Sequence, residues 1–254
     1  MLTSISDLDI EILYYLDIRS IMRLSLISKD QYAILSAEDF IIELRVLKYN
    51  GIYLVNVAAR NNCLSVIQWL YESTNNFVYD WDAITRAAEN GYVDVLEWFK
   101  KNGFDFGYYE KAIMQASRNS HINVLQWFKD SGLEFKYSKK TINLGMFNIN
   151  VLEWFKNSGL EFKYDEDVID LASIEGFVPV LEWFKNSGYE FKYRYAINNA
   201  IVYGRIDILE WFKNSGYEIR YSGAAIRLAS KRNHISVFEW FKNSGINLDI
   251  MQYM

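Results

Sequence analysis

The chain has 254 residues, 51% of them hydrophobic, and a formal net charge of −5. The mild acidity argues against generic binding to nucleic acid or to an anionic membrane, because both need a basic face. A single cysteine, Cys63, excludes an intrachain disulfide and a four-thiolate zinc site. The N-terminus has acids where a signal peptide needs bases, and no apolar run reaches membrane-spanning length, so we expect a cytoplasmic location.

Residues 1–48 form the first predicted element, a small helical domain. In "LDIEILYYLDIRSIMRLSLISKDQYAIL" the apolar residues fall on one helical face and then on a second. The stretch resembles the F-box, which implies docking on the Skp-type adaptor of an SCF (cullin–RING) ubiquitin ligase. The docking contacts that the resemblance implies are Leu8, Ile12, Leu13, Leu16, Ile21, Leu24 and Ile27, with Lys29 nearby. The alternative is that residues 1–48 only cap the repeats that follow. Residues 37–49 are expected to form a bridging helix.

A heptapeptide then recurs through residues 49–254. "EWFKNSG" begins at Glu153, Glu182, Glu210 and Glu239, and near copies begin at Gln68, Glu97 and Gln126. Its tryptophans are Trp69, Trp98, Trp127, Trp154, Trp183, Trp211 and Trp240. Their spacings of 27 to 29 residues indicate stacked supersecondary units.

Each heptapeptide is predicted to be most of a short helix. Three residues before it stands Ser65, Asp94, Asn123, Asn150, Pro179, Asp207 or Ser236. Six of these are helix-capping residues, and with the Glu or Gln of the heptapeptide they predict capping boxes. The closing glycine is expected to take the left-handed conformation. A helix this short needs stacking, so we expect the tryptophans to line a buried spine.

A second apolar pattern precedes each heptapeptide, as in "DAITRAAENG" and "AAIRLASKRNH", and predicts another helix that ends in a tight turn. The unit "AAENGYVDVLEWFKKNGFDF" (Ala87–Phe106) resembles the ankyrin repeat, and the wording "EWFKNSG…EFKY" resembles more narrowly the ankyrin proteins of giant DNA viruses of amoebae, of mimivirus type. The resemblance implies an all-α solenoid of about seven helix-turn-helix repeats. Each unit is about four residues short of the family's length, which predicts shortened fingers. The fourth unit is shorter again, and we expect a distortion there.

No motif in the sequence points to catalysis, so we expect no enzyme, no cofactor and no metal site. His121, His234 and Cys63 occupy the same turn in different units, which favours a structural role. The acids of Asp165–Ser173 suit a solvated helix start. The alternating loop "GYEFKY" could be a nucleic-acid platform, but a buried Phe191 with outward Glu190 and Lys192 is the favoured interpretation.

The resemblance implies that a protein partner meets the concave face of the repeats, made of first helices and fingers. Candidate partner-binding residues there are Trp81, Glu89, Arg118, Asn119, Glu166, Arg194, Tyr203, Lys231 and Arg232. Two functions fit: a substrate-recognition adaptor of an SCF-type ubiquitin ligase, or a binding scaffold with no link to a ligase. For a viral protein the location would be the host cytoplasm.

Overall fold

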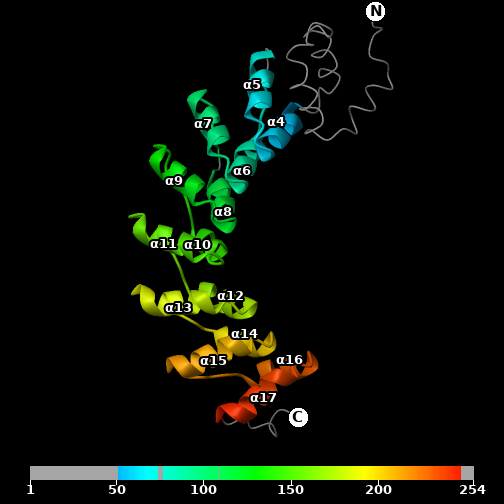
Figure 1. Cartoon of the computed structure of the whole chain (residues 1–254), viewed down its shortest axis with the longest axis vertical. Coiled ribbons are helices and arrows are strands. Elements are labelled where there is room, and N and C mark those ends of the chain that lie inside the picture. The colour runs from blue at the N-terminus through cyan, green and yellow to red at the C-terminus, as the bar shows by residue number, and fades with distance from the viewer. Residues whose placement is uncertain (1–50, 74–76, 108, 247–254) are drawn as a thin grey trace, which may run out of the picture. The chain divides into compact units, whose positions relative to one another are not determined.

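A computed structural model describes residues 51–73, 77–107 and 109–246 of the chain, and these residues are all-helical, without strands (Figure 1). The helices are α4 (Gly51–Arg60), α5 (Leu64–Ser73), α6 (Trp81–Glu89), α7 (Val93–Lys101), α8 (Glu110–Arg118), α9 (Ile122–Asp130), α10 (Lys139–Gly145), α11 (Ile149–Asn157), α12 (Asp167–Glu175), α13 (Val178–Ser187), α14 (Ala196–Val202), α15 (Ile206–Ser215), α16 (Gly223–Lys231) and α17 (Ile235–Ser244). The F-box-like segment, its docking residues from Leu8 to Lys29 and the expected bridging helix lie outside the described residues, so they stay predictions.

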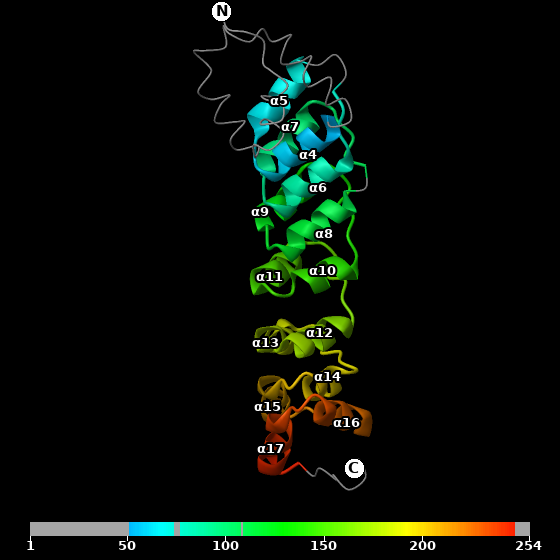
Figure 2. The same ribbon diagram turned by 90° about the vertical axis from the view of Figure 1, so that its right-hand side faces the viewer.

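The described helices alternate between two kinds, as the sequence predicts. An even-numbered first helix is followed by a tight turn and an odd-numbered second helix that carries the heptapeptide. Their contacts divide the described residues into two compact units: those from 51 to 116 with 123–133, and those from 117 to 122 with 134–246. In the second unit α10, α12, α14 and α16 contact one another in sequence, and so do α11, α13, α15 and α17 (Figure 2).

The core of each repeat is made by the phenylalanine of the heptapeptide rather than by its tryptophan. The six described copies are buried, with at most 2% exposed: Phe99, Phe128, Phe155, Phe184, Phe212 and Phe241. Small and branched residues of the first helices, such as Ala87 and Ile84, close the core from the other side. Trp183 and Trp240 are 8% exposed, whereas Trp98, Trp127, Trp154 and Trp211 are half-buried. The predicted tryptophan spine is therefore wrong in part: the indoles lie at the edge of the core.

The ends of the helices follow the glycines. Every glycine that closes a described heptapeptide has a positive φ, for example 77° at Gly216 and 72° at Gly103. A Cβ at either position would meet nothing within 4 Å, so the backbone conformation alone requires glycine. The turn after the first helix needs the same conformation. Three repeats have a glycine at this turn, namely Gly91, Gly176 and Gly204, and three have another residue, namely Asn62, Ser120 and Asn233. All six have positive φ.

The fourth repeat, α10 and α11, lacks this left-handed turn, as its shorter length predicts. The short helix α10 ends at Gly145, and Met146 remains right-handed, with φ −61°. Asn148 then caps α11 by accepting a hydrogen bond from the Asn150 amide at 3.0 Å. A Cβ on Gly145 would lie 2.4 Å from Ser117 Oγ and 2.6 Å from Val151 Cγ1. Gly145 therefore lies so close to α8 of the preceding repeat and to α11 of its own that a Cβ would not fit without a shift.

The predicted capping boxes of the second helices are wrong. These helices begin one residue before the expected caps, so Asp94 and Asp207 lie inside the first turn. The residues at the cap positions of α7, α13, α15 and α17 make no side-chain cap hydrogen bond. Pro179 still lies in the first turn of α13, where a missing N–H is harmless. No described helix is both long and apolar enough to cross a membrane.

Candidate partner-binding surface

At four junctions the heptapeptide joins one repeat to the next through its glutamate and tryptophan. The indole Nε1 of Trp127 donates to Glu97 at 2.8 Å, and Trp211 donates in the same way to Glu182 at 2.8 Å. Trp183 and Trp240 repeat the bond to Glu153 and Glu210. The accepted hydrogen bond lowers the pKa of Glu97, Glu182 and Glu210, because it stabilises the carboxylate. The glutamate therefore serves the neighbouring repeat and does not cap its own helix.

The other letters of the heptapeptide support this contact. The ammonium of Lys185 lies 5.8 Å from the ring centre of Trp211, and Lys156 lies at the same distance from Trp183. The amide of Asn186 donates to Glu182 at 2.8 Å. The hydroxyl of Ser187 donates to the carbonyl of Phe184 and accepts from the Tyr189 amide, which fixes the last turn. The heptapeptide sequence is thus repeated because the same interface forms at successive junctions between repeats.

The loop "EFKY" builds a second set of contacts between repeats. The Tyr164 hydroxyl donates to the carbonyl of Glu190 at 3.0 Å, and Tyr137 donates to that of Glu161. Burial raises the pKa of Tyr137 to about 12. Phe191 was expected to be buried and is half-buried. Its ring stacks on that of Trp211, with the ring centres 5.4 Å apart. These rings contact one another, so the loop does not present a free aromatic row.

The first helices carry one row of half-buried or exposed side chains whose chemistry changes from repeat to repeat. In each first helix from α6 to α16, one residue belongs to the row: the residue directly before the first buried alanine or glycine in the second half of the helix. In the first unit it reads Arg86 and Gln115, and in the second unit it reads Leu144, Leu171, Asn199 and Leu228. Leu171 and Leu228 are 38% and 43% exposed. We call this set the variable row. Asn199 is the member of the row that donates a hydrogen bond to the preceding repeat, at 3.3 Å from the Asp170 carbonyl.

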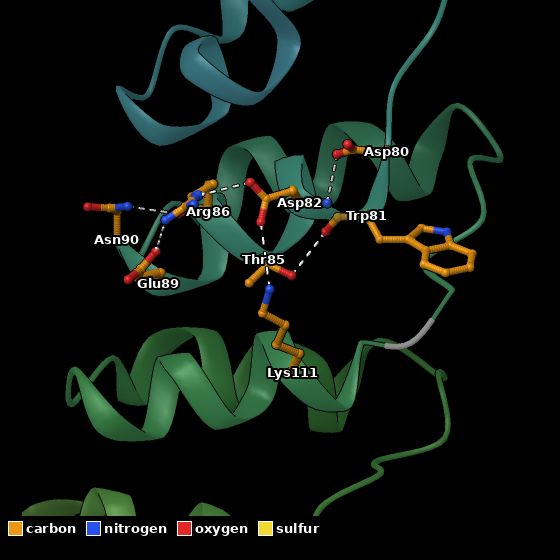
Figure 3. Close-up of polar contacts among 8 residues, drawn as sticks. All are labelled: Asp80, Trp81, Asp82, Thr85, Arg86, Glu89, Asn90 and Lys111. Carbon is orange, nitrogen blue, oxygen red and sulfur yellow. Dashed lines mark hydrogen bonds and ion pairs between the residues drawn. The ribbon is translucent and has the colours of Figure 1, made fainter. Parts of the chain in front are cut away.

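In α6 of the first unit, Trp81 is the first residue, and Arg86 of the variable row lies towards the other end of the helix (Figure 3). Trp81 is 45% exposed, yet its ring lies against Gly107, where a Cβ would be 2.0 Å from the indole. On the same helix the guanidinium of Arg86 bonds Asp82 at 3.0 Å and Glu89 at 3.1 Å. The hydrogen bond and charge of Asp82 raise the pKa of Arg86. An exposed but fixed indole is the kind of side chain that dominates protein interfaces.

An ion pair connects α6 to the next first helix, α8. The ammonium of Lys111 on α8 lies 3.8 Å from Asp82 on α6 (Figure 3). Asp82, Arg86 and Lys111 were missed by the sequence reasoning. The signal for Asp82 and Arg86 was available, since residues four apart share one face of a helix.

The remaining predicted binding residues lie at opposite ends of the first helices. Glu166 and Arg194 stand at the N-terminal end, where their side chains pair at 3.0 Å. The C-terminal ends carry Glu89 in the first unit and Arg118, Asn119, Tyr203, Lys231 and Arg232 in the second. Of these, Arg232 and Tyr203 are in contact, with the guanidinium 4.7 Å from the ring centre. The structure thus brings together two pairs of the predicted residues and does not gather the whole set.

The candidates for chemistry have structural surroundings. The Cys63 thiol is buried and donates to the Asn61 carbonyl at 3.2 Å. The His234 ring lies against Gly204, where a Cβ would be 2.7 Å from Nδ1. Asp170, in the acidic segment, is 7% exposed and accepts from the amides of Arg194 and Tyr195. Within the described ranges no cluster of His, Cys, Asp and Glu could hold a metal ion.

The geometry defines an all-helical protein built from repeated helix pairs, with a fixed framework and a variable row. A scan against protein-family models matches none of them, and a search of curated proteins finds no significant match.

Proposed function

We propose that the chain is a protein-interaction module of ankyrin-like repeats, and that it acts as the substrate-recognition adaptor of an SCF-type ubiquitin ligase. The repeats hold the protein to be modified, and residues 1–48 dock on the Skp-type adaptor. It has no enzymatic activity of its own in this proposal.

One observation carries the binding role: the framework is uniform while the variable row is not. Residues such as Glu182 and Trp211 are repeated because each makes the same contact with the next copy. At the variable row the same backbone position holds a cation, an amide or a leucine, as at Arg86, Asn199 and Leu171. A surface of this kind can match one particular partner without disturbing the stack.

The ligase link is carried by the F-box resemblance alone, and a pull-down tests it. Purified Skp-type adaptor should be retained by the full chain and lost in the double variant Leu13→Asp, Leu16→Asp. The matched control is Leu171→Asp, Leu228→Asp, which makes the same change on the variable row and should retain the adaptor. If the wild-type chain fails to bind the adaptor, the ligase role is wrong.

The second candidate function is a binding scaffold without a ligase, in which residues 1–48 cap the repeats. The same experiment separates the two. The scaffold is supported if the adaptor does not bind and if removal of residues 1–48 exposes apolar surface and lowers the stability of the repeats. The variable row serves both functions equally.

A further inference from the structure

The first-helix layer of the second unit ends in a basic surface. We define it by Arg227, Leu228, Lys231 and Arg232 of α16 and its C-cap, with Tyr203 at the end of α14. All five side chains are exposed. Arg227 and Lys231 stand four residues apart, as do Leu228 and Arg232, so the two pairs form adjoining stripes on one side of the helix.

The charge of this basic surface is not compensated by ion pairs within the described part of the chain. Neither α14 nor α16 contains an acidic residue. The nearest glutamate in the preceding loop, Glu218, is already paired with Arg220 at 2.6 Å. No described carboxylate lies within ion-pair distance of Arg227, Lys231 or Arg232. A chain with net charge −5 therefore carries a local region of opposite sign.

One cation of the basic surface is held in place before any partner arrives. The Arg232 guanidinium lies 4.7 Å from the centre of the Tyr203 ring and donates through Nη1 to the Val202 carbonyl at 3.0 Å. These contacts use one N–H and leave the exposed side chain with other donors. A pre-positioned guanidinium binds a carboxylate with less loss of side-chain entropy than a mobile one.

Apolar area accompanies the charge. Leu228 is 43% exposed and Tyr203 is 41% exposed. A partner with carboxylates can form ion pairs with the cations, and an aliphatic side chain of that partner can pack against Leu228 and the Tyr203 ring. A nucleic-acid backbone offers the charge without the aliphatic group.

We propose that the basic surface binds an acidic protein segment that carries an aliphatic residue. This assignment rests on the proposed protein-binding function and adds the chemistry of the partner at α14 and α16.

Fluorescence anisotropy with the full chain tests the proposal. The probe is a labelled glutamate-rich peptide that contains leucine, compared with the same peptide with glutamine in place of glutamate. The wild-type chain should bind the acidic probe, more weakly as salt is added, and should not bind the glutamine form. The double variant Arg227→Gln, Lys231→Gln should weaken binding by about tenfold. Neither side chain has a partner within the described residues, so circular dichroism should show an unchanged melting temperature.

The matched control is Lys213→Gln, Lys242→Gln, which removes the same charge from the second helices α15 and α17. It should bind the probe as the wild type does. Equal loss in both double variants would show a net-charge effect and overturn the proposal, as would absence of binding by the wild type. Tighter binding of labelled oligothymidylate through Arg227 and Lys231 would assign the surface to nucleic acid instead.

Failure here and failure of the proposed function are distinguishable. If the adaptor pull-down succeeds and the peptide does not bind, only the assignment of α16 is wrong. If the peptide binds and the adaptor does not, the ligase link is lost and the basic surface remains.

Discussion

The indole nitrogen of Trp240 lies 2.7 Å from the Glu210 carboxylate and donates a hydrogen bond to it, which joins α17 to α15. The same bond recurs between Trp211 and Glu182. The contact links two copies of one heptapeptide, so the same glutamate and tryptophan join neighbouring repeats wherever this bond forms.

This contact predicts part of the acid sensitivity of the protein. The bond from the indole lowers the folded-state pKa of Glu182 and Glu210 below the ordinary 4.5. Their contribution to stability is therefore complete above that value and is lost as pH falls through the folded pKa. The double variant Glu182→Gln, Glu210→Gln should lose less stability on acidification than the wild type, measured by urea unfolding at a series of pH values. A double variant that loses as much stability on acidification as the wild type would contradict the assignment.

A second prediction concerns the two kinds of aromatic side chain. Phe212 is fully buried in the core, whereas Phe191 is half-buried in the loop. Phe212→Ala should destabilise the protein by about 3–5 kcal/mol, because it leaves a cavity that the stack cannot close. Phe191→Ala removes the same atoms and should cost clearly less. Denaturant unfolding followed by circular dichroism compares them, and equal losses would mean that the heptapeptide phenylalanine is not the centre of the core.

A third prediction separates two reasons for glycine. Gly216 has φ 77° and open space around its missing Cβ, so Gly216→Ala should cost roughly 1–2 kcal/mol and Gly216→Asn less. Gly145→Ala has ordinary backbone angles but places a Cβ 2.4 Å from Ser117 Oγ. Asparagine should not rescue that position, since the obstacle is steric. Thermal unfolding of the four variants checks the pattern, and it fails if asparagine is the better substitute at both glycines.

A fourth prediction concerns the buried carboxylate of Asp170. Burial raises its pKa above the ordinary 3.8, so its ionisation opposes folding at neutral pH. Asp170→Asn keeps an acceptor for the Tyr195 amide, as Asn198 does for the Ser222 amide one repeat later. The variant should be more stable than the wild type at pH 7, and the gain should shrink as pH falls through the raised pKa. Asp170→Ala orphans the amide and should lose about 1–3 kcal/mol. A gain for alanine as well would show that the hydrogen bond contributes nothing.

A fifth prediction tests the division between framework and variable row. Leu171→Gln and Leu228→Gln change exposed side chains and should alter stability by no more than about 0.5 kcal/mol. Leu181→Gln and Leu209→Gln bury an amide where the leucine is fully buried and should be severely destabilising. Melting temperatures compare the two pairs. Severe loss in the first pair would mean that the variable row is part of the framework.

The sequence predicted the elements well because their signals are local. The period of the tryptophans and the spacing of Ile and Ala gave the two helices of each repeat. The distortion of the fourth unit followed from its length, and the left-handed glycines followed from the need to end a helix. These depend on residues within one turn or one repeat.

Two of the wrong expectations, the capping boxes and the tryptophan spine, share a cause. The capping boxes failed because Glu97 accepts from Trp127, 30 residues away, and does not reach back to its own helix. The tryptophan spine failed because the adjacent phenylalanine takes the centre of the core. In both cases a tertiary partner outweighed a local preference.

The sequence by itself determined the repeat, its helices and its turns, because helix periodicity, glycine geometry and length are properties of contiguous residues. Only the tertiary structure decided which ring is buried, which carboxylate meets which indole, and which cations of α16 lack a described partner. Those outcomes depend on side chains about one repeat apart, and the packing of one helix pair on the next is what brings them within bonding distance.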